Sequence, residues 1–390
     1  MRKIAAHYIF PIVDKPIKNG ALTLSDEGEI LAISGLEGEE ESVEFYNGIL
    51  CPGFVNAHCH LELSSMLGSI PQYTSLFGFI QYMNSREHPK EQEQISAILK
   101  ADNSMFADGI IAVGDISNTS VSFDIKVSSP ISYRNFIEVY GSNSAIAESH
   151  FNRGTAVVAQ AMLRGLKASL TPHAPYSMSD MLLDMVVLET KKSSILSIHN
   201  QESKDENEYF INGKGAFSRR YAIDDFVPPT VIGKPSIYRI LDKLKEDIKL
   251  LLIHNIYTSA EDYDAAVAKN KDTHWVLCPN SNLYIEKQLP PVDMLRQKSA
   301  NIAIGTDSLA SNTALSILEE LKTIGKYFRD VSLEELLAWA TMGGAKALGF
   351  DEHIGSFEIG KKPHVVLIDG VDFNAMQLTD DSKVTLLTRP

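Results

Sequence analysis

The 390-residue sequence predicts an α/β protein: a (β/α)8 barrel of the TIM type with a small β-sandwich domain formed by both chain ends. Two observations predict it. Short β-branched runs alternate with helical patterns between about residues 50 and 350, and the segments on either side both read as strands joined by turns. We therefore assign 1–50 plus 355–390 to the small domain and 51–354 to the barrel.

The N-terminal strands are expected at 6–13, 21–25 and 29–34, because turn residues separate these apolar runs. The eight barrel strands are expected at 51–57, 109–117, 131–140, 167–173, 194–200, 248–255, 273–279 and 300–307. A helix is expected over 332–349, where Ser332 and Glu335 form a capping box and the leucines that follow make one apolar face. The run 364–369 predicts a C-terminal strand of the small domain.

Composition and charge exclude several classes of function. The chain is 44% hydrophobic and 22% charged, as in a soluble globular protein, and no apolar run approaches the roughly 20 residues that span a bilayer. A formal net charge of −14 argues against nucleic acid and against an anionic membrane surface as partners. The three cysteines, Cys51, Cys59 and Cys278, form no CxxC pair, which disfavours a disulfide framework and predicts a cytoplasmic protein.

The first barrel strand ends in two histidines that flank a cysteine, His58-Cys59-His60. Because side chains alternate along a strand, His58 and His60 are expected on one side and Cys59 on the other. Two imidazoles on one side can reach one metal ion, although an HxH pair alone also fits a frayed strand end.

Polar residues recur at the carboxyl ends of other barrel strands, where the chemistry of such barrels lies. They are His173, His199, His254 and Asp307. His199 and Asp307 complete a set of nitrogen and oxygen ligands with His58 and His60. Taken singly, each histidine also fits a hydrogen-bonded core residue, and Asp307 also fits a helix N-cap. Together they predict one divalent metal ion, Zn2+ in preference to Fe2+ or Mn2+, with one position open for water.

Glu202 follows His199 by three residues and is the candidate general base. A metal ion lowers the pKa of a bound water to about 7, and a nearby carboxylate can take and relay its proton. The alternative for Glu202 is a solvated loop carboxylate. His254 is placed to orient the water or polarise the substrate, and His173 to contact the substrate from the opposite wall.

Several motifs together resemble the amidohydrolase superfamily. They are "HCH" (58–60), "SIHNQES" (197–203), "LLIHN" (251–255), "CPNSNLY" (278–284) and "IGTDSLASN" (304–312). The resemblance covers nearly the whole chain and is to the cytosine deaminase and triazine hydrolase (chlorohydrolase-like) branch. Within it, "NAHCHLELS" and "TPHAPYS" resemble the aminodeoxyfutalosine deaminases.

The resemblance implies His58, His60, His199 and Asp307 as metal ligands, Glu202 as the proton shuttle and His254 as a residue near the metal water. No lysine stands at the end of the fourth strand, where binuclear members carry a carbamylated one, which implies a single metal. The departure at Pro363-His364, where the family usually has Ala-Asp, lies outside the barrel and affects only local packing.

The predicted activity is hydrolytic deamination of an amino-substituted N-heterocycle, purine-like and in the narrowest form aminodeoxyfutalosine, with release of ammonia. Glu202, His254 and Asp307 are the predicted catalytic residues; His173, Glu62 and Phe77 are the predicted substrate contacts. The alternative for Phe77 is an ordinary core position of the helix after the first barrel strand. The alternative for Glu62 is a residue that only supports the local structure.

Two alternatives stay open. One is a cyclic amide hydrolase or chlorohydrolase that uses the same mononuclear site. The other, a metal-bearing binding protein without catalysis, is disfavoured because the positions of the base and of every ligand are filled. The expected partner is a small-molecule substrate, and a homodimer remains an open alternative.

Overall fold

The computed structural model of the protein describes residues 1–36, 42–86, 89–190, 195–223, 227–244 and 248–387. Its strands are β1 (Arg2–Ile9), β2 (Ile17–Leu24), β3 (Ile30–Gly35), β4 (Val43–Pro52), β5 (Phe54–Cys59), β6 (Ile110–Ser117), β7 (Ser132–Val139), β8 (Lys167–Pro172), β9 (Ile195–Asn200), β10 (Lys249–His254), β11 (Thr273–Leu277), β12 (Asn301–Ile304), β13 (Val365–Asp369) and β14 (Lys383–Leu386).

The α-helices are α1 (Ser75–Ser85), α2 (Glu91–Ala107), α3 (Phe123–Ser128), α4 (Ala147–Leu163), α5 (Asp180–Thr190), α6 (Lys204–Asn212), α7 (Ala216–Ile223), α8 (Tyr238–Leu241), α9 (Ala260–Lys269), α10 (Pro279–Glu286), α11 (Val292–Gln297), α12 (Ile317–Tyr327), α13 (Leu333–Ala338) and α14 (Gly344–Leu348). Short 3-10 helices cover Leu61–Met66, Ser144–Ile146 and Pro175–Ser177, and a π-helical turn covers Trp339–Gly343.

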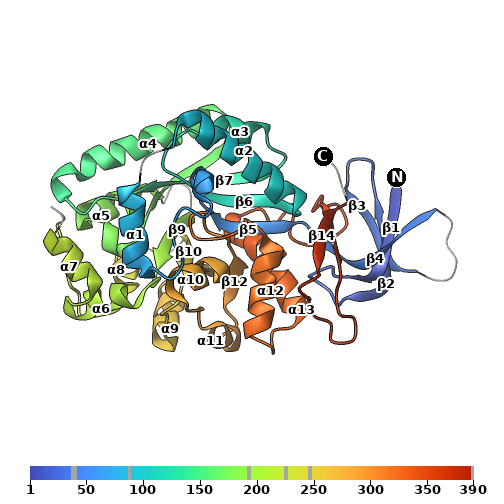
Figure 1. The fold of residues 1–390 in the computed structure, drawn as a ribbon. Coiled ribbons are helices and arrows are strands. Elements are labelled where there is room, and N and C mark those ends of the chain that lie inside the picture. Colours follow the sequence, from blue (N-terminus) through green and yellow to red (C-terminus); the bar gives the residue numbers. More distant parts are fainter. Residues whose placement is uncertain (37–41, 87–88, 191–194, 224–226, 245–247, 388–390) are drawn as a thin grey trace.

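Both chain ends contribute to one six-stranded sheet, in the order β14-β13-β4-β1-β2-β3. Figure 1 shows this sheet at one end of the molecule, with both termini beside it. Apolar residues of β1, β2, β4 and β13 pack together on it, among them Ile4, Leu22, Leu50 and Val365. The prediction that the distant β-rich ends associate is therefore confirmed.

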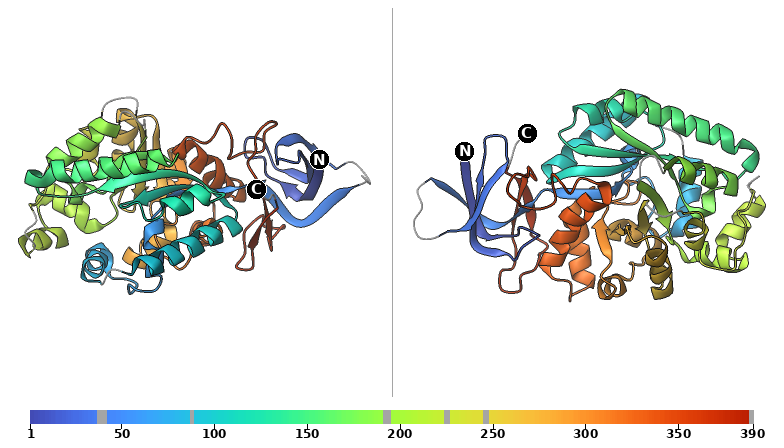
Figure 2. Two further views of the ribbon diagram at one scale, coloured as in Figure 1. Left: turned by 90° about the horizontal axis from the view of Figure 1, so that it is seen from above. Right: turned by 180° about the vertical axis from the view of Figure 1, so that it is seen from behind.

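The strands between them form two four-stranded parallel sheets, β5-β6-β7-β8 and β12-β11-β10-β9. In chain order, each of these strands is followed by at least one helix, and Figure 2 shows the helices lying around the strands. Hydrogen bonds connect the sheets at both edges: the Thr306 amide donates to the His58 carbonyl at 3.0 Å, and the His199 amide donates to the His173 carbonyl at 2.9 Å.

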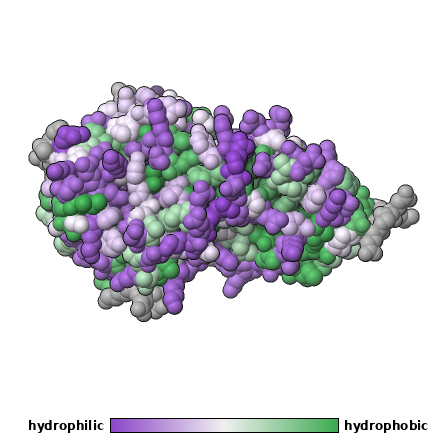
Figure 3. Space-filling model, turned by 90° about the horizontal axis from the view of Figure 1, so that it is seen from below, coloured by the Kyte–Doolittle hydropathy of each residue, from purple (hydrophilic) through white to green (hydrophobic). Residues whose placement is uncertain are grey.

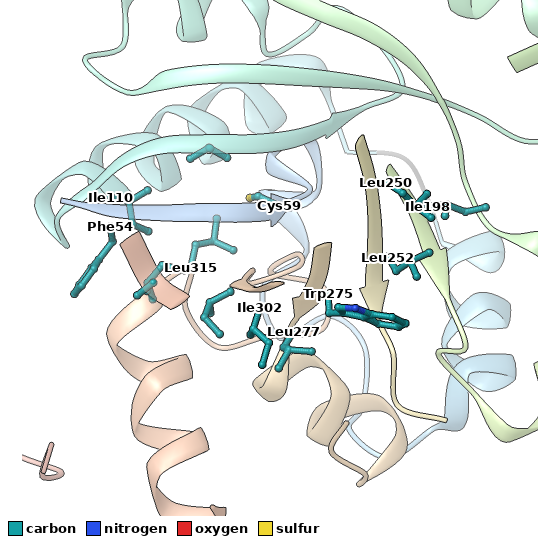
Figure 4. Close-up of a cluster of buried hydrophobic side chains, with 14 of the residues drawn as sticks. Phe54, Cys59, Ile110, Ile198, Leu250, Leu252, Trp275, Leu277, Ile302 and Leu315 are labelled. Atoms are coloured by element: carbon teal, nitrogen blue, oxygen red, sulfur yellow. The ribbon is translucent and has the colours of Figure 1, made fainter. Parts of the chain in front are cut away.

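Buried side chains of these strands fall into two layers. One layer, which we call the inner cluster, joins both sheets and includes Val55, Ala112, Phe136, Ile253 and Ala303. The other, the outer core, lies between the strands and the helices. Figure 4 shows part of the outer core, where Trp275, Leu277, Leu252 and Ile302 gather from neighbouring strands. The alternation of the two layers identifies the face of each strand that points inward.

The predicted strand at 51–57 is wrong, because it spans two strands. Residues 51–52 end β4 in the six-stranded sheet, and β5 begins at Phe54. Gly53 joins the two strands where the backbone runs close to Ile111: a Cβ at residue 53 would lie 2.7 Å from the Ile111 side chain. The predicted strand at 6–13 is also displaced, to Arg2–Ile9, and Ile12 has a positive φ of 80° just beyond its end.

The helix predicted over 332–349 is present but not regular. The capping box of Ser332 and Glu335 is confirmed at its start. The π-helical turn then separates α13 from α14. Gly343 lies in this turn, where a Cβ would come within 2.2 Å of the Ile302 carbonyl oxygen, so the helix backbone packs directly against β12.

The surface carries no extended apolar band on the face drawn in Figure 3, where hydrophilic residues lie between smaller apolar patches. Within the described ranges, no helix is both long and apolar enough to cross a membrane. Cys51, Cys59 and Cys278 are buried, free cysteines.

Candidate active site

Four histidines from three separate segments of the sequence meet at the carboxyl ends of the parallel strands. The ring of His58 lies 4.9 Å from the rings of both His60 and His199, and 5.8 Å from that of His254, measured between ring centroids. We call His58, His60, His199 and His254 the histidine cluster. Asp307, just after β12, lies against it.

A β-bulge in β5 aims the first two histidines inward. The register between β5 and β6 shifts between Asn56 and Cys59, so β5 has one more residue than its partner there. Cys59 consequently packs in the outer core, while His58 and His60 face each other on the opposite side. Simple alternation placed the two histidines on one side correctly, but the bulge itself could not be read from the sequence.

The spacing of the polar atoms fits one metal ion. His60 Nε2 lies 3.3 Å from His199 Nε2, and Asp307 Oδ1 lies 3.5 Å from His60 Nε2. Asp307 Oδ1 is also 3.7 Å from His58 Nε2. Ligand atoms held about 2.0–2.1 Å from a tetrahedral ion are about 3.3–3.4 Å apart, so these separations are those of a ligand shell.

His58 provides an independent test of that fit. Its side chain is fully buried, and neither ring nitrogen has a hydrogen-bond partner among the residues that the structure describes. Buried polar atoms are rarely left without a partner, because the loss of hydration is not compensated. A cation between His58, His60 and Asp307, whose ligand atoms lie within 4.8 Å of one another, would satisfy the ring.

The groups behind these residues hold them in ligand geometry. His199 Nδ1–H donates to the His173 carbonyl at 2.8 Å, which leaves Nε2 with its lone pair toward His60. The Oδ2 atom of Asp307 accepts hydrogen bonds from Ser281 Oγ at 2.6 Å and Ser311 Oγ at 2.7 Å, so Oδ1 remains for the cluster. Such outer contacts are typical of metal sites.

Burial keeps His60, His199 and His254 uncharged near neutral pH. Burial, followed by the neighbouring imidazoles, lowers the pKa of His60 to about 3 and that of His199 well below its usual value. The pKa of His254 is lowered to about 4, again mainly by burial. Neutral imidazoles at neutral pH are the form that binds metals.

Glu202 lies beside the cluster and is buried. Its Oε1 atom is 3.6 Å from His254 Nε2, and burial, together with Asp307 and other nearby carboxylates, raises its pKa well above the usual value. His254 Nδ1–H donates to Asn282 Oδ1 at 2.8 Å, which directs Nε2 toward Glu202. A buried carboxyl with a raised pKa suits a group that both takes and returns a proton.

The turns that carry these side chains have unusual backbone conformations. Gln201, His254, Asn255 and Asp307 have positive φ values of 45°, 73°, 60° and 57°. Non-glycine residues seldom adopt this region, and such residues concentrate at functional sites. The sequence did not reveal them, because a left-handed turn at a strand end has no distinctive residue pattern when it is not glycine.

Of the predicted substrate contacts, His173 lies nearest the cluster. Its ring centroid is 4.8 Å from that of His199, and its Nδ1 is hydrogen-bonded to Ser177 Oγ at 2.7 Å. Phe77 lies half-buried on α1. Its helix neighbours Leu76 and Phe79 pack with Tyr176, whose ring is 5.6 Å from that of His173.

Glu62 is bonded within the protein. Its Oε2 accepts from the Asn118 amide at 3.2 Å, and its Oε1 accepts from the amide and the hydroxyl of Thr119 at 3.2 and 3.1 Å. Burial raises its pKa to about 7. Glu62 thus ties the segment after β5 to the loop after β6.

Sequence reasoning missed several polar residues that support the site. They are Asp115, Asn118, Lys126, Glu138, Ser281, Asn282 and Ser311. The available signal was a polar residue within an otherwise apolar strand, as in "IIAVGDIS" and "SYRNFIEV". That signal identifies a buried polar group but not its partner.

A fully buried ion pair holds the backbone next to His60. Asp115 Oδ1 accepts a hydrogen bond from the Leu61 amide at 2.7 Å, and its Oδ2 is paired with Lys126. Lys126 also donates to Ser117 Oγ at 2.9 Å and Asn135 Oδ1 at 2.7 Å. All four side chains are buried.

Replacing Lys126 with alanine is expected to destabilise the protein by about 3–5 kcal/mol, because Asp115 would remain buried without its partner. The free energy of unfolding in urea measures this. The control is Lys298→Ala, which breaks a surface pair with Asp264 and should change the free energy by at most about 1 kcal/mol. Equal effects of the two substitutions would exclude the proposed role of the pair.

The buried carboxyls predict how stability depends on pH. Mainly through burial, the pKa is raised to about 7 in Glu62 and Glu206 and to about 8 in Glu320. In the window from about 6.5 to 8, the folded state therefore binds protons that the unfolded chain has released. Stability should fall as pH rises through this window, by at most about 1.4 kcal/mol per group and pH unit.

Urea unfolding in the presence of a chelator, at pH 6.5, 7.2 and 8.0, measures the slope. Unfolded histidines are about half protonated at pH 6.5 and largely neutral above about pH 7.2. The depressed pKa values of His60 and His254 therefore oppose this fall at the lower end of the window and affect its upper part little. Glu320→Gln should flatten the slope, whereas Glu319→Gln, at a half-exposed neighbour, should leave it unchanged. A stability that rises across the window would show that the buried carboxyls are ionised.

The chain was compared with known proteins. Residues 49–389 match the model of the "Amidohydrolase family". Adenosine deaminase of Helicobacter pylori is 30% identical over 328 residues, which cover 82% of this chain and 78% of that protein. Aminodeoxyfutalosine deaminase of Nitratiruptor sp. is 28% identical over 334 residues, 83% of this chain and 79% of that protein.

Among solved structures, aminofutalosine deaminase of Helicobacter pylori in complex with methylthio-coformycin superposes with a TM-score of 0.80 at 26% identity. The match covers 95% of this chain and 93% of that one. The family resemblance predicted from the motifs is confirmed by these comparisons. The chain belongs to the amidohydrolase family.

Proposed function

We propose that this protein is a metal-dependent hydrolytic deaminase of an amino-substituted N-heterocycle. The observation that carries the proposal is the convergence of the histidine cluster and Asp307 with a buried carboxyl, Glu202, whose pKa is raised. The names of the relatives, which are deaminases of adenosine and aminodeoxyfutalosine, support the same reaction.

His58, His60, His199 and Asp307 would hold one divalent ion, and three imidazoles with one carboxylate favour Zn2+ over Fe2+ or Mn2+. Such an ion supplies Lewis acidity and makes water a nucleophile near neutral pH. Asp307 contributes Oδ1 to this shell, while its serine-bonded Oδ2 keeps the carboxylate in a fixed orientation.

Glu202 would move the protons of the reaction. It takes one from the attacking water as the new C–O bond forms at the ring carbon that bears the amino group. It delivers that proton to the ring nitrogen. It then takes the second proton of the water from the new hydroxyl group and delivers it to the amino group as the C–N bond breaks, so that water and substrate yield a ring carbonyl and ammonia. His254 Nε2, 3.6 Å from Glu202, would orient the attacking water by accepting a hydrogen bond, because its Nδ1–H is donated to Asn282.

The substrate is proposed to be purine-like, with aminodeoxyfutalosine as the narrowest candidate. His173 would contact the ring from the wall opposite Glu202, and Phe77 on α1 would cover it, because α1 packs against the Tyr176 side of His173. Glu62 remains a proposed substrate contact, although both its oxygens accept hydrogen bonds from the 118–119 loop.

The test is ammonia release from a panel of aminopurine nucleosides, aminodeoxyfutalosine, aminopyrimidines, cyclic amides and chlorotriazines. We expect ammonia from an aminopurine nucleoside. Turnover of a cyclic amide or a chlorotriazine without ammonia from any amine would instead establish the alternative, a cyclic amide hydrolase or chlorohydrolase that uses the same site.

We further infer that the two parallel sheets are halves of one closed (β/α)8 barrel over residues 51–354. The hydrogen bonds at both sheet edges and the inner cluster shared by both sheets support closure. Residues 1–50 and 355–390 would form the small domain, with the six-stranded sheet folded as a sandwich around its own apolar cluster. A cytoplasmic location and a homodimer remain predictions.

A further inference from the structure

Glu138 is a buried carboxyl to which the proposed reaction gives no role. It lies near the end of β7, one inward-facing position beyond Phe136, which belongs to the inner cluster. Its neighbours Ile137 and Val139 point into the outer core. Glu138 therefore faces the interior at the strand end, with a side chain that is only 5% exposed.

One oxygen of Glu138 is fixed by Asn118. Asn118 Nδ2 donates to Glu138 Oε2 at 3.1 Å and to the Glu138 carbonyl at 3.2 Å. The Asn118 backbone is held in turn by Glu62. A series of hydrogen bonds thus links Glu62, in the segment after β5, through Asn118 to Glu138 on β7. These bonds hold Glu138 Oε2 and so set the direction of Oε1.

That other oxygen faces a proposed metal ligand. Glu138 Oε1 lies 3.6 Å from His199 Nδ1 and has no hydrogen-bond partner within the part of the chain that the structure describes. The Nδ1–H of His199 is directed to the His173 carbonyl at 2.8 Å. A carboxyl oxygen and a carbonyl oxygen thus both lie near Nδ1, the ring nitrogen that does not face His60 Nε2.

We propose that Glu138 is a positioning residue for His199, which strengthens the binding of a divalent cation at His199 Nε2. The inference rests on the part of the proposed function that makes His199 a ligand. A carboxyl group near the far nitrogen of a ligand imidazole favours an N–H there, fixes the ring and makes the ligand nitrogen more basic. Loss of such a group typically weakens metal binding about 10–100-fold.

The test is the dissociation constant of Zn2+, measured by competition with a chromophoric chelator and without substrate. Glu138→Gln, which keeps the size of the side chain, should bind Zn2+ 10–100-fold more weakly at an unchanged stoichiometry of one ion. The control is Asp102→Asn, an equally buried carboxyl on α2 that accepts from Ser129 and Tyr133, and its affinity should stay within about twofold of the wild type.

Circular dichroism of the metal-free variants shows whether they fold. If Glu138→Gln does not fold, Asn118→Ala, which frees Glu138 from its hydrogen bonds, is judged by the same loss of affinity. An unchanged affinity in a folded Glu138→Gln overturns the inference. So does a wild-type stoichiometry of two ions that falls to one in the variant, because Glu138 would then be a direct ligand.

These outcomes separate the inference from the proposed function. A wild-type protein that binds no Zn2+ overturns both the metal site and the role of Glu138. A wild-type protein that binds one Zn2+ but releases no ammonia overturns the deaminase alone, and the comparison of affinities still decides the role of Glu138.

Discussion

Glu202→Gln is expected to lower the rate of ammonia release by about 10³-fold while the metal content of the protein stays unchanged. Glutamine keeps the size of the side chain but cannot accept a proton from the attacking water. Because Glu202 is buried beside His254, no solvent carboxylate can replace it. The measurement pairs kcat for the best substrate of the panel with elemental analysis of the same preparation.

The control is Glu208→Gln, on the helix α6 that begins two residues after Glu202; Glu208 is not among the residues that approach the histidine cluster. It should retain the wild-type rate. If Glu202→Gln also retained that rate with its metal bound, the proton transfer would have to be assigned to another group.

Asp307→Ala should remove both the bound metal and nearly all activity. The carboxylate supplies the only oxygen in the proposed ligand set, and its Oδ1 approaches both His58 and His60. Its loss also leaves the hydroxyls of Ser281 and Ser311 without their common acceptor. Zinc content after dialysis and ammonia release at saturating substrate measure the two effects.

Asp293→Ala, at an exposed aspartate on α11, is the control and should bind metal as the wild type does. Full zinc content in Asp307→Ala would mean that the histidines alone hold the ion. Asp307 would then be limited to a role in the reaction itself.

The strand ends could be located from the sequence for two reasons. Side chains alternate along every β-strand, and the active sites of parallel α/β folds lie at the carboxyl ends of their strands. His58, His60, His199, His254 and Asp307 were selected on those grounds, and the structure brings them together. The bulge in β5 could not be predicted, because it depends on how β5 pairs with β6.

The supporting contacts were beyond sequence reasoning for a different reason. Ser281 and Ser311 are separated by 30 residues and meet at Asp307 only because α10 and the loop after β12 pack together. Glu138 was visible as the one acid of β7, but nothing local indicated that its second oxygen faces His199.

The strand at 51–57 was predicted wrongly and the strand β14 was missed, in both cases because of short local features of the sequence. The run 51–57 is apolar apart from Asn56 and reads as one strand, although β4 ends and β5 begins near Gly53. The strand β14 was not predicted, because Lys383–Leu386 alternates polar and apolar residues over only four positions, too few to identify a strand before it pairs with β13.

The central claim is that one divalent ion, held by His58, His60, His199 and Asp307, is required for deamination. Its most direct test follows metal content and ammonia release together while a chelator removes the metal and added Zn2+ restores it. We expect about one ion per chain, a parallel loss of both quantities and a parallel recovery. Full ammonia release from protein without metal would show that the reaction does not depend on this site.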